Sequence, residues 1–323
     1  DPYDFTTKLN SSSVTYSSIS LTITYTEPYS ACTAPSTVST PTDVAPGTDV
    51  TLSWSGAGAG TNNAITGYQV YRSTSAASGY TALGNKVVAT ATSGSLTVTS
   101  HATNGSSYYY KVATIGTVAG YDSGQSSAYA TLKTTVTDPT APTAVSTPTN
   151  VAPSSTQDLT WSGAAAGTNN AISTYEIHRS TDGGATYSLL TTDSASPLAV
   201  TAPATNGGIF TYKVKTVGAR SNSGLSSVYA TLKTTVGAPG VPTAVSVTSG
   251  SEVAPGKLRT LSWSGASNGT NNPIKGYHVY RSVNGGAYAY LAEVLTTATS
   301  GSLSVTAASS AATYTYKVLV LGN

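Results

Sequence analysis

The stretch T-L-S-W-S-G-A-G-A-G-T-N-N-A-I-T-G-Y-Q-V-Y-R-S, from Thr51 to Ser73, decides the fold because it returns twice in similar form. The second copy reads L-T-W-S-G-A-A-A-G-T-N-N-A-I-S-T-Y-E-I-H-R-S (Leu159 to Ser180), and the third reads L-S-W-S-G-A-S-N-G-T-N-N-P-I-K-G-Y-H-V-Y-R-S (Leu261 to Ser282). The tryptophans of the copies recur at an interval of about one hundred residues, which is the size of one small domain and too long for a solenoid repeat. The sequence therefore predicts an array of three similar domains, and such arrays connect, space or bind more often than they catalyse.

The composition gives this array few charges. Only 9% of the 323 residues are charged, and 15 basic against 13 acidic residues give a formal net charge of +2. This balance offers no electrostatic footprint for nucleic acid or for an anionic membrane. Ser, Thr, Asn and Gly must then form most of the surface, which is common on secreted, cell-surface and virion proteins. No apolar run approaches the roughly 20 residues of a membrane helix.

The chain contains one cysteine, Cys32, so no disulfide can form within it. An extracellular eukaryotic module of this kind would be expected to carry cysteine pairs, so a bacterial or bacteriophage origin is favoured. Two interpretations of Cys32 are open, a free thiol in the linker Y-S-A-C-T-A-P and an intermolecular bond.

Short alternating runs rich in Val, Thr and Tyr occur throughout the chain, bounded by Gly, Pro, Asn and Ser. In the first copy Val50, Leu52 and Trp54 alternate with polar residues, so one strand face carries all three apolar side chains. A Y-x-Y-x-V run follows at 108–112, and the last strand is expected from Ala128 to Val136. This pattern predicts an antiparallel sandwich of two sheets in each copy.

Each copy resembles a fibronectin type III domain. The resemblance is carried by the Trp of the second strand, the G-Y-x-V-Y-R-S third strand, the Leu of the fifth, the Y-x-Y-K-V sixth strand and the leading prolines. The variant with A-G-T-N-N-x-I and V-Y-R-S looks most like modules of Firmicutes surface proteins and of phage or prophage structural proteins.

The resemblance implies an all-β chain of three tandem seven-strand immunoglobulin-like (fibronectin type III) β-sandwiches. The third sandwich is expected to lack its last strand, and an N-terminal β-strand segment is expected to precede the first. The expected boundaries are 1–32 for that segment (the end of a preceding domain or a donor strand), then 33–138, 139–238 and 239–323 for the three sandwiches.

The linkers between the copies are short and rich in proline. Thr134 to Pro148 reads T-T-V-T-D-P-T-A-P-T-A-V-S-T-P, and Thr234 to Ala244 reads T-T-V-G-A-P-G-V-P-T-A. Proline holds a chain extended, so consecutive modules are expected to sit end to end as a semi-rigid rod with little burial between them.

The two ends of the chain differ from its middle. The third copy ends soon after its sixth strand, Tyr314 to Val318, without a counterpart of Ala128 to Val136. At the other end, Ile19 to Pro28 (I-S-L-T-I-T-Y-T-E-P) aligns without gaps on Ala130 to Pro139.

Two explanations of these ends are open. In the first, they are cut edges of a longer polypeptide, and residues 1–27 are the tail of a preceding β domain. In the second, Ser13 to Thr26 of one chain completes the third sandwich of the next, because an unfilled sandwich edge exposes core residues and unpaired backbone groups. The apolar residues of that donated strand would be Ile19, Leu21, Ile23 and Tyr25.

No residue pattern of an enzyme stands out. The histidines, His101, His178 and His278, hold different positions in their copies, and we expect none to have a carboxylate or second histidine at ligand spacing. The carboxylates are scattered, and no calcium loop of the D-x-D-x-D-G type occurs. The glycines from Gly56 to Gly60 precede no predicted helix, so a phosphate cradle is not expected. The sequence thus predicts no enzyme, no catalytic, cofactor-binding or metal-ligating residues, and no cofactor.

The most repeated polar cluster is T-N-N, which follows the second strand in every copy. Asn tolerates left-handed backbone angles and ties its side chain to nearby backbone, so the main interpretation is a structural loop. A second interpretation makes each loop a polar contact to a ligand such as a glycan, or to a partner in an assembly. The residues concerned are Thr61, Asn62, Asn63, Thr168, Asn169, Asn170, Thr270, Asn271 and Asn272.

Aromatic residues are mainly tyrosine, with 22 Tyr against two Phe. By alternation Tyr68, Tyr108 and Tyr110 are expected in the core, and each V-Y-R-S arginine is expected to lie over a tyrosine ring. Exposed tyrosines suit a binding surface, because their rings are rigid and carry a polar tip. The better candidates for exposure are Tyr3, Tyr109, Tyr121 and Tyr290, and the V-Y-R-S arginines are Arg72, Arg179 and Arg281.

These features predict a non-enzymatic, extracellular structural or adhesion array that acts as a semi-rigid spacer and interaction module. We expect it to be part of a phage virion appendage (tail or head fibre, decoration) or of a bacterial surface filament. The expected partners are other copies of itself, other virion or surface proteins, and cell-surface glycan, without nucleic acid or membrane insertion. The alternative is an accessory spacer, or carbohydrate-binding modules, of a secreted glycoside hydrolase.

Overall fold

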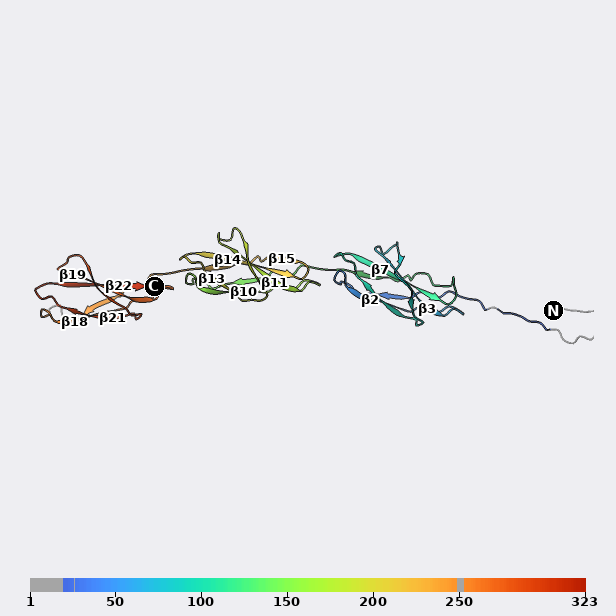
Figure 1. The fold of residues 1–323 in the computed structure, drawn as a ribbon, viewed down its shortest axis with the longest axis horizontal. Helices are drawn as coiled ribbons and strands as arrows, with labels where there is room; N and C mark the ends of the chain where they lie inside the picture. Colours follow the sequence, from blue (N-terminus) through green and yellow to red (C-terminus); the bar gives the residue numbers. More distant parts are fainter. Residues whose placement is uncertain (1–19, 26, 249–252) are drawn as a thin grey trace, which may run out of the picture. The chain divides into compact units, whose positions relative to one another are not determined.

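Each copy of the repeat folds as its own β-sandwich in the computed structural model, which describes residues 20–25, 27–248 and 253–323 (Figure 1). These residues form strands, turns and loops without a helix, and so without a helix that could cross a membrane. The chain divides into two compact units, Asp1–Thr135 with one sandwich and Val136–Asn323 with two. The predicted all-β fold class is confirmed.

The first sandwich packs a sheet of three strands against a larger sheet. The smaller sheet has the order β1 (Thr37–Ser39), β2 (Asp49–Ser55), β6 (Gly94–Thr99). The larger sheet has the order β4 (Thr81–Ala82), β3 (Ile65–Ser73), β7 (Ser107–Gly116), β8 (Ala130–Lys133), and β5 (Val87–Val88) also pairs with β3. All of these pairs are antiparallel, as the alternating pattern predicts.

The second sandwich repeats this plan. Its smaller sheet has the order β13 (Leu198–Thr201), β10 (Thr156–Ser162), β9 (Ala144–Ser146). Its larger sheet contains β12 (Ser188–Asp193), β11 (Ile172–Ser180) and β14 (Ile209–Gly218), and both β15 (Asn222–Leu225) and β16 (Ala230–Lys233) pair with β14. The last strand of each sandwich, β8 or β16, therefore lies beside the long sixth strand.

The third sandwich has one strand fewer. Figure 1 shows β18 (Leu258–Ser264) and β21 (Gly301–Thr306) in one layer, where β17 (Ala244–Val247) also pairs, and β19 (Ile274–Val283) and β22 (Tyr314–Gly322) in the other. On the far side of β19 lies β20 (Ala289–Val294). Within the described residues β22 pairs with β19 alone, so up to Asn323 no strand takes the place that β8 and β16 hold in the other sandwiches.

A tryptophan and a tyrosine from facing sheets form the centre of each core. Trp54 lies 5.2 Å from Tyr68 between ring centroids, and the matching pairs in the other sandwiches are separated by 5.5 Å and 5.1 Å. Around them, Leu52, Val70 and Val112 are buried, as their alternation predicts. The three hydrophobic clusters share no residue, so each sandwich has a core of its own.

Two local expectations need correction. The predicted last strand from Ala128 to Val136 is shorter, because β8 covers only Ala130–Lys133. Tyr108 is only partly buried, although Tyr68 and Tyr110 are fully buried as expected. The reason is that Tyr108 lies at the edge of the core, where the guanidinium carbon of Arg72 covers its ring at 4.3 Å from the centroid.

Replacing Trp161 by Ala should unfold the second sandwich selectively. The indole is only 6% exposed, so truncation removes its packing and leaves a cavity that the two sheets cannot close. We expect a loss of about 3–5 kcal/mol of unfolding free energy, measured by calorimetry of the whole chain. The control is Tyr229→Ala, because that side chain is 59% exposed. Equal melting curves for the two variants would contradict the core assignment.

Candidate functional site: linker clamps and an open sheet edge

Each T-N-N loop holds the linker that enters its own sandwich. In the first, the Ser30 N–H donates to the carbonyl oxygen of Thr61 at 3.2 Å, and the Thr61 N–H donates to Ser30 Oγ at 2.6 Å. The second sandwich repeats both bonds between Thr137 and Thr168, at 3.2 Å and 2.7 Å. In the third, the Gly237 N–H donates to the carbonyl oxygen of Thr270 at 2.9 Å. We call this arrangement the linker clamp.

The glycine before each T-N-N lets the linker approach this closely. A Cβ atom at Gly167 would lie 2.0 Å from the carbonyl oxygen of Thr137, far inside any van der Waals contact. The same atom would lie 1.9 Å from a linker oxygen at Gly60 and 2.0 Å from one at Gly269. A side chain at any of these positions would therefore push the linker out of the clamp.

The second asparagine of the loop is buried in the first two sandwiches, and its counterpart Asn272 in the third is partly buried. Asn63 and Asn170 are each 1% exposed. The Asn170 amide nitrogen donates to the carbonyl oxygen of Thr137 at 3.0 Å and to that of Ser221 at 3.1 Å, and its oxygen accepts from the Arg220 N–H at 2.9 Å. These bonds satisfy buried backbone groups of the linker and of a neighbouring loop.

The first asparagine of each loop turns the backbone. Asn62, Asn169 and Asn271 have φ angles of 51°, 51° and 49°, the left-handed conformation expected for this loop. Asn271 also reaches the second sandwich, because its amide nitrogen donates to the carbonyl oxygens of Asn150 at 2.7 Å and Thr235 at 2.8 Å. This contact joins the two sandwiches of the second compact unit.

The clamp supports the structural interpretation of the T-N-N residues. The glycan-contact interpretation stays a prediction, and the amides of Asn63 and Asn170 are engaged by the chain's own backbone. Cys32 also belongs to the first clamp as a buried free thiol, with its Sγ atom 3.6 Å from the Asn63 carbonyl oxygen.

The V-Y-R-S arginines lie over aromatic rings, as the sequence predicts. The guanidinium carbons of Arg72 and Arg281 lie 4.3 Å and 4.5 Å from the ring centroids of Tyr108 and Tyr314. In the second sandwich Arg179 lies 4.6 Å from a phenylalanine ring instead. A cation above a ring face is attracted by the negative charge of that face.

The expectation that no histidine has a carboxylate partner is wrong. His178 Nε2 lies 3.2 Å from Glu176 Oε2, which also accepts from Lys215 Nζ at 3.1 Å. Hydrogen bonds from His178 and Lys215 hold the pKa of the Glu176 carboxyl below its usual value. The sequence signal was E-x-H on a strand, since alternate residues share one strand face.

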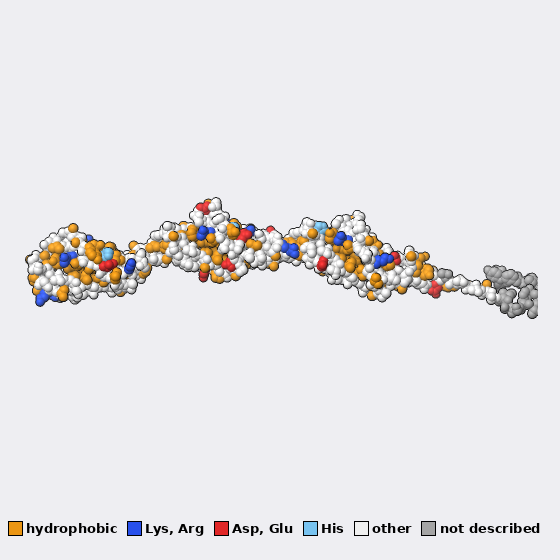
Figure 2. All heavy atoms as spheres, in the orientation of Figure 1, with side chains coloured by type: hydrophobic (Ala, Val, Ile, Leu, Met, Phe, Trp, Pro, Cys, Tyr) orange, Lys and Arg blue, Asp and Glu red, His pale blue; other side chains and the backbone are white. Residues whose placement is uncertain are grey.

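His278 has a similar partner, with its Nε2 3.7 Å from Glu293 Oε1. Neither pair forms a metal centre, because no group of three or more potential metal ligands occurs in the described ranges. Figure 2 shows a surface of mainly uncharged polar atoms in which blue and red side chains are scattered. That face offers no concentrated charge for a charged substrate.

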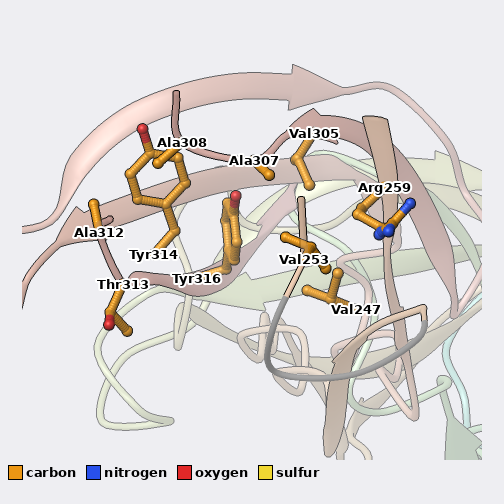
Figure 3. A pocket seen from close by; sticks show the side chains of 10 residues that line it. All are labelled: Val247, Val253, Arg259, Val305, Ala307, Ala308, Ala312, Thr313, Tyr314 and Tyr316. Atoms are coloured by element: carbon orange, nitrogen blue, oxygen red, sulfur yellow. The ribbon is translucent and has the colours of Figure 1, made fainter. Parts of the chain in front are cut away.

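The open edge of the third sandwich leaves apolar side chains uncovered. Val245 of β17 is 42% exposed, whereas its counterparts Val38 and Val145 are 7% and 8% exposed. The covering residues in those sandwiches are Leu132 of β8 and Leu232 of β16, both fully buried. The third sandwich also has a cavity of about 270 Å³ that is lined by Val247 of β17 and by Tyr314 and Tyr316 of β22 (Figure 3).

Residues 20–25 of the predicted N-terminal β-strand segment are not in a strand in the structure, since no strand pairs with them among the described residues, and their apolar side chains are exposed. Leu21, Ile23 and Tyr25 are 82%, 79% and 78% exposed. Ile19, the fourth predicted donor residue, lies outside the described residues, as does Tyr3. Donation of this strand to another chain stays a prediction at this point.

Comparison with known proteins gives likenesses of structure alone. A scan against protein-family models and a search of curated proteins both give no match. Among solved structures, the crystal structure of chicken CNTN1 FN1-FN3 domains is similar at 15% identity and a TM-score of 0.30, over 88% of this chain and 94% of that one. The crystal structure of FN3tt is similar at 22% identity and a TM-score of 0.25, over 31% and 97%. At these TM-scores the likenesses carry no argument, and the fold rests on the strand order described above.

Replacing Asn170 by Ala should loosen the second clamp. The variant leaves the backbone groups of Thr137, Ser221 and Arg220 without their amide partner. We expect a loss of about 1–3 kcal/mol in unfolding free energy of the second sandwich, measured by calorimetry, together with faster proteolysis of residues 136–142. Asn222→Ala is the matched control, because Asn222 is exposed on β15. Unchanged proteolysis in Asn170→Ala would show that the amide does not hold the linker.

Proposed function

We propose that the chain is a non-enzymatic, extracellular structural or adhesion array that acts as a semi-rigid spacer and interaction module. The observation that carries this proposal is the linker clamp, which recurs in all three sandwiches. A clamped linker loses the freedom of a flexible tether, so consecutive modules keep a preferred relation to each other. This is the property that a spacer needs.

The proposed setting is a phage virion appendage (tail or head fibre, decoration) or a bacterial surface filament. An uncharged polar surface, a single buried thiol and independent cores suit a protein that works outside a cell without disulfides. The proposed partners are other copies of the chain or other virion or surface proteins. Nucleic acid is not proposed, since the net charge of +2 offers no footprint for it.

Distance measurements between the second and third sandwiches test the spacer. Spin labels at Asn222→Cys and Ser302→Cys should give one narrow distance distribution in the whole chain. Gly269→Ala and Asn271→Ala should broaden it, because they disrupt the clamp and the bonds to Asn150 and Thr235.

The control for this measurement is Gly224→Ala, since a Cβ there meets open space. A wild-type distribution as broad as that of Gly269→Ala would refute a stiff junction.

A second candidate function is carbohydrate binding, as in an accessory module of a secreted glycoside hydrolase. It is favoured by a cluster of rings on β19 and β20, where Tyr290 is 57% exposed. The Tyr290 ring centroid lies 5.3 Å from that of His278 and 6.0 Å from that of Tyr280. Rigid aromatic groups with polar tips suit a sugar surface.

A glycan array tests this second candidate. If the ring cluster binds sugar, the chain should retain one class of glycan, and Tyr290→Ala should weaken that signal at least about tenfold, in line with a hot-spot aromatic residue. Tyr229→Ala is the control, because Tyr229 is a similarly exposed tyrosine of the second sandwich. Equal signals for both variants would exclude the cluster as the sugar site.

A further inference from the structure

The open edge of the third sandwich matches a site that the chain itself fills twice. In the first sandwich, β8 pairs with β7 so that Leu132 lies opposite Tyr108, and β16 repeats this with Leu232 opposite Phe210. The residue at that position of β22 is Tyr314, which lines the cavity together with Tyr316, Val247 and Val305 (Figure 3). The open edge therefore has the geometry to accept a β-strand that points an apolar side chain toward the core.

The loop before the second strand confirms this shape. In the first sandwich the Val44 N–H donates to the carbonyl oxygen of Lys133 at 3.1 Å, and its carbonyl accepts from the Thr135 N–H at 3.0 Å. Val151 makes the same two bonds to the end of β16. Val253 is their counterpart and lines the cavity, but no strand lies beside it among the described residues.

A buried donor also points to an absent acceptor. Arg259 lines the cavity, and its Nε atom is buried without a hydrogen-bond partner in the described ranges. Buried polar atoms are almost always paired in native proteins. The carbonyl oxygens of an added strand are acceptors of the required kind.

The chain contains a segment with the right place and pattern to fill this edge. Both β8 and β16 lead directly into a clamped linker, and residues 20–25 lead into the linker that Thr61 clamps. In that segment Leu21, Ile23 and Tyr25 alternate with Ser20, Thr22 and Thr24, so one face is apolar and the other polar. All three apolar side chains are exposed to solvent.

The clamp refines the register of this segment. Ser30 takes the place of Thr137 in its clamp, which puts Tyr25 at the position of Leu132. The gapless alignment puts Leu21 there instead, four residues away. An even shift leaves the same face inward, so both registers bury apolar residues of one face, with Leu21 at the central position in the gapless register and Tyr25 in the clamp register.

We propose that residues 20–25 of one chain add as the seventh strand to β22 of a second copy. The occupant of the open edge is thus another molecule of this protein, joined head to tail. Because donor and acceptor lie at different places on the chain, each added copy carries a free donor strand and a free open edge, so the contact builds a head-to-tail assembly, which is a ring or a filament. This inference goes beyond the proposed spacer function and does not depend on it.

Disulfide trapping between two differently labelled chains tests the pairing. In the first sandwich Tyr109 faces Thr131 across β7 and β8, and Thr315 is the counterpart of Tyr109 on β22. Facing residues of antiparallel strands have Cα atoms about 4.5–5.5 Å apart, which a disulfide can bridge. Chains with Thr24→Cys (clamp register) or Ser20→Cys (gapless register) should therefore crosslink to chains with Thr315→Cys.

The controls use the same chemistry on a filled edge. Tyr109→Cys lies on β7, whose edge is already paired with β8 of the same sandwich. A donor strand cannot add there, so Tyr109→Cys should trap the Thr24→Cys chain at least about tenfold less than Thr315→Cys does. Adding Ile23→Asp to the donor should reduce trapping similarly, because it buries a charge at the open edge. Chains whose only cysteine is the buried Cys32 give the background level of crosslinking.

The crosslinking experiment uses the full-length natural chain. Crosslinking of Thr315→Cys by either donor cysteine, above the Tyr109→Cys level, supports the proposal and fixes the register. If both donor cysteines crosslink to Thr315→Cys only at the background level, the proposal is overturned. That result is also expected if a longer chain fills the open edge with its own residues. Equal trapping by Thr315→Cys and Tyr109→Cys overturns it as well.

Discussion

A carbonyl oxygen of the linker lies against a glycine in each sandwich, and this close approach holds each linker against the sandwich that follows it. At Gly167 an added Cβ atom would lie 2.0 Å from the Thr137 oxygen, so no other residue allows the contact. The T-N-N residues next to the glycine then bond the linker through backbone and side-chain amides. The repeat that dominates the sequence is thus the part of each module that receives the chain before it.

Backbone bonds and apolar packing hold this molecule together with little help from ion pairs. Several cationic side chains lie over aromatic rings, as Arg72 does over Tyr108 and Lys317 over Tyr288. Glu176 pairs with Lys215 and His178 at a partly exposed site, where an ion pair contributes at most about 1 kcal/mol. Salt screens exposed charge pairs but not buried apolar contacts. The stability of the sandwiches should therefore vary little with ionic strength, which suits the extracellular setting that we propose.

The third sandwich shows what the seventh strand contributes. Without a neighbour on β22, Val245 is largely uncovered and Tyr316 is only partly buried, although its counterparts Tyr110 and Tyr212 are fully buried. Arg259 Nε and Asn272 Oδ1 are buried and unpaired among the described residues, whereas the Oδ1 atoms of Asn63 and Asn170 accept from loops that follow the sixth strand. In the first two sandwiches the seventh strand thus covers the apolar core, and the end of that strand pairs with the backbone of Val44 or Val151. Residues 20–25 carry an exposed apolar face, and the proposed pairing with β22 would cover that face and the open edge together.

The sequence by itself determined the fold class and the three cores, because the alternation around Trp54, Trp161 and Trp263 depends only on the period of a strand. It also predicted the left-handed asparagines, since that conformation is a local property of Asn next to a tight turn. Only the tertiary structure decided that the T-N-N loops clamp linkers and that Glu176 meets Lys215, which lies on another strand. Contacts between residues distant in the chain depend on strand register and on where a linker docks, and a single sequence does not contain those distances.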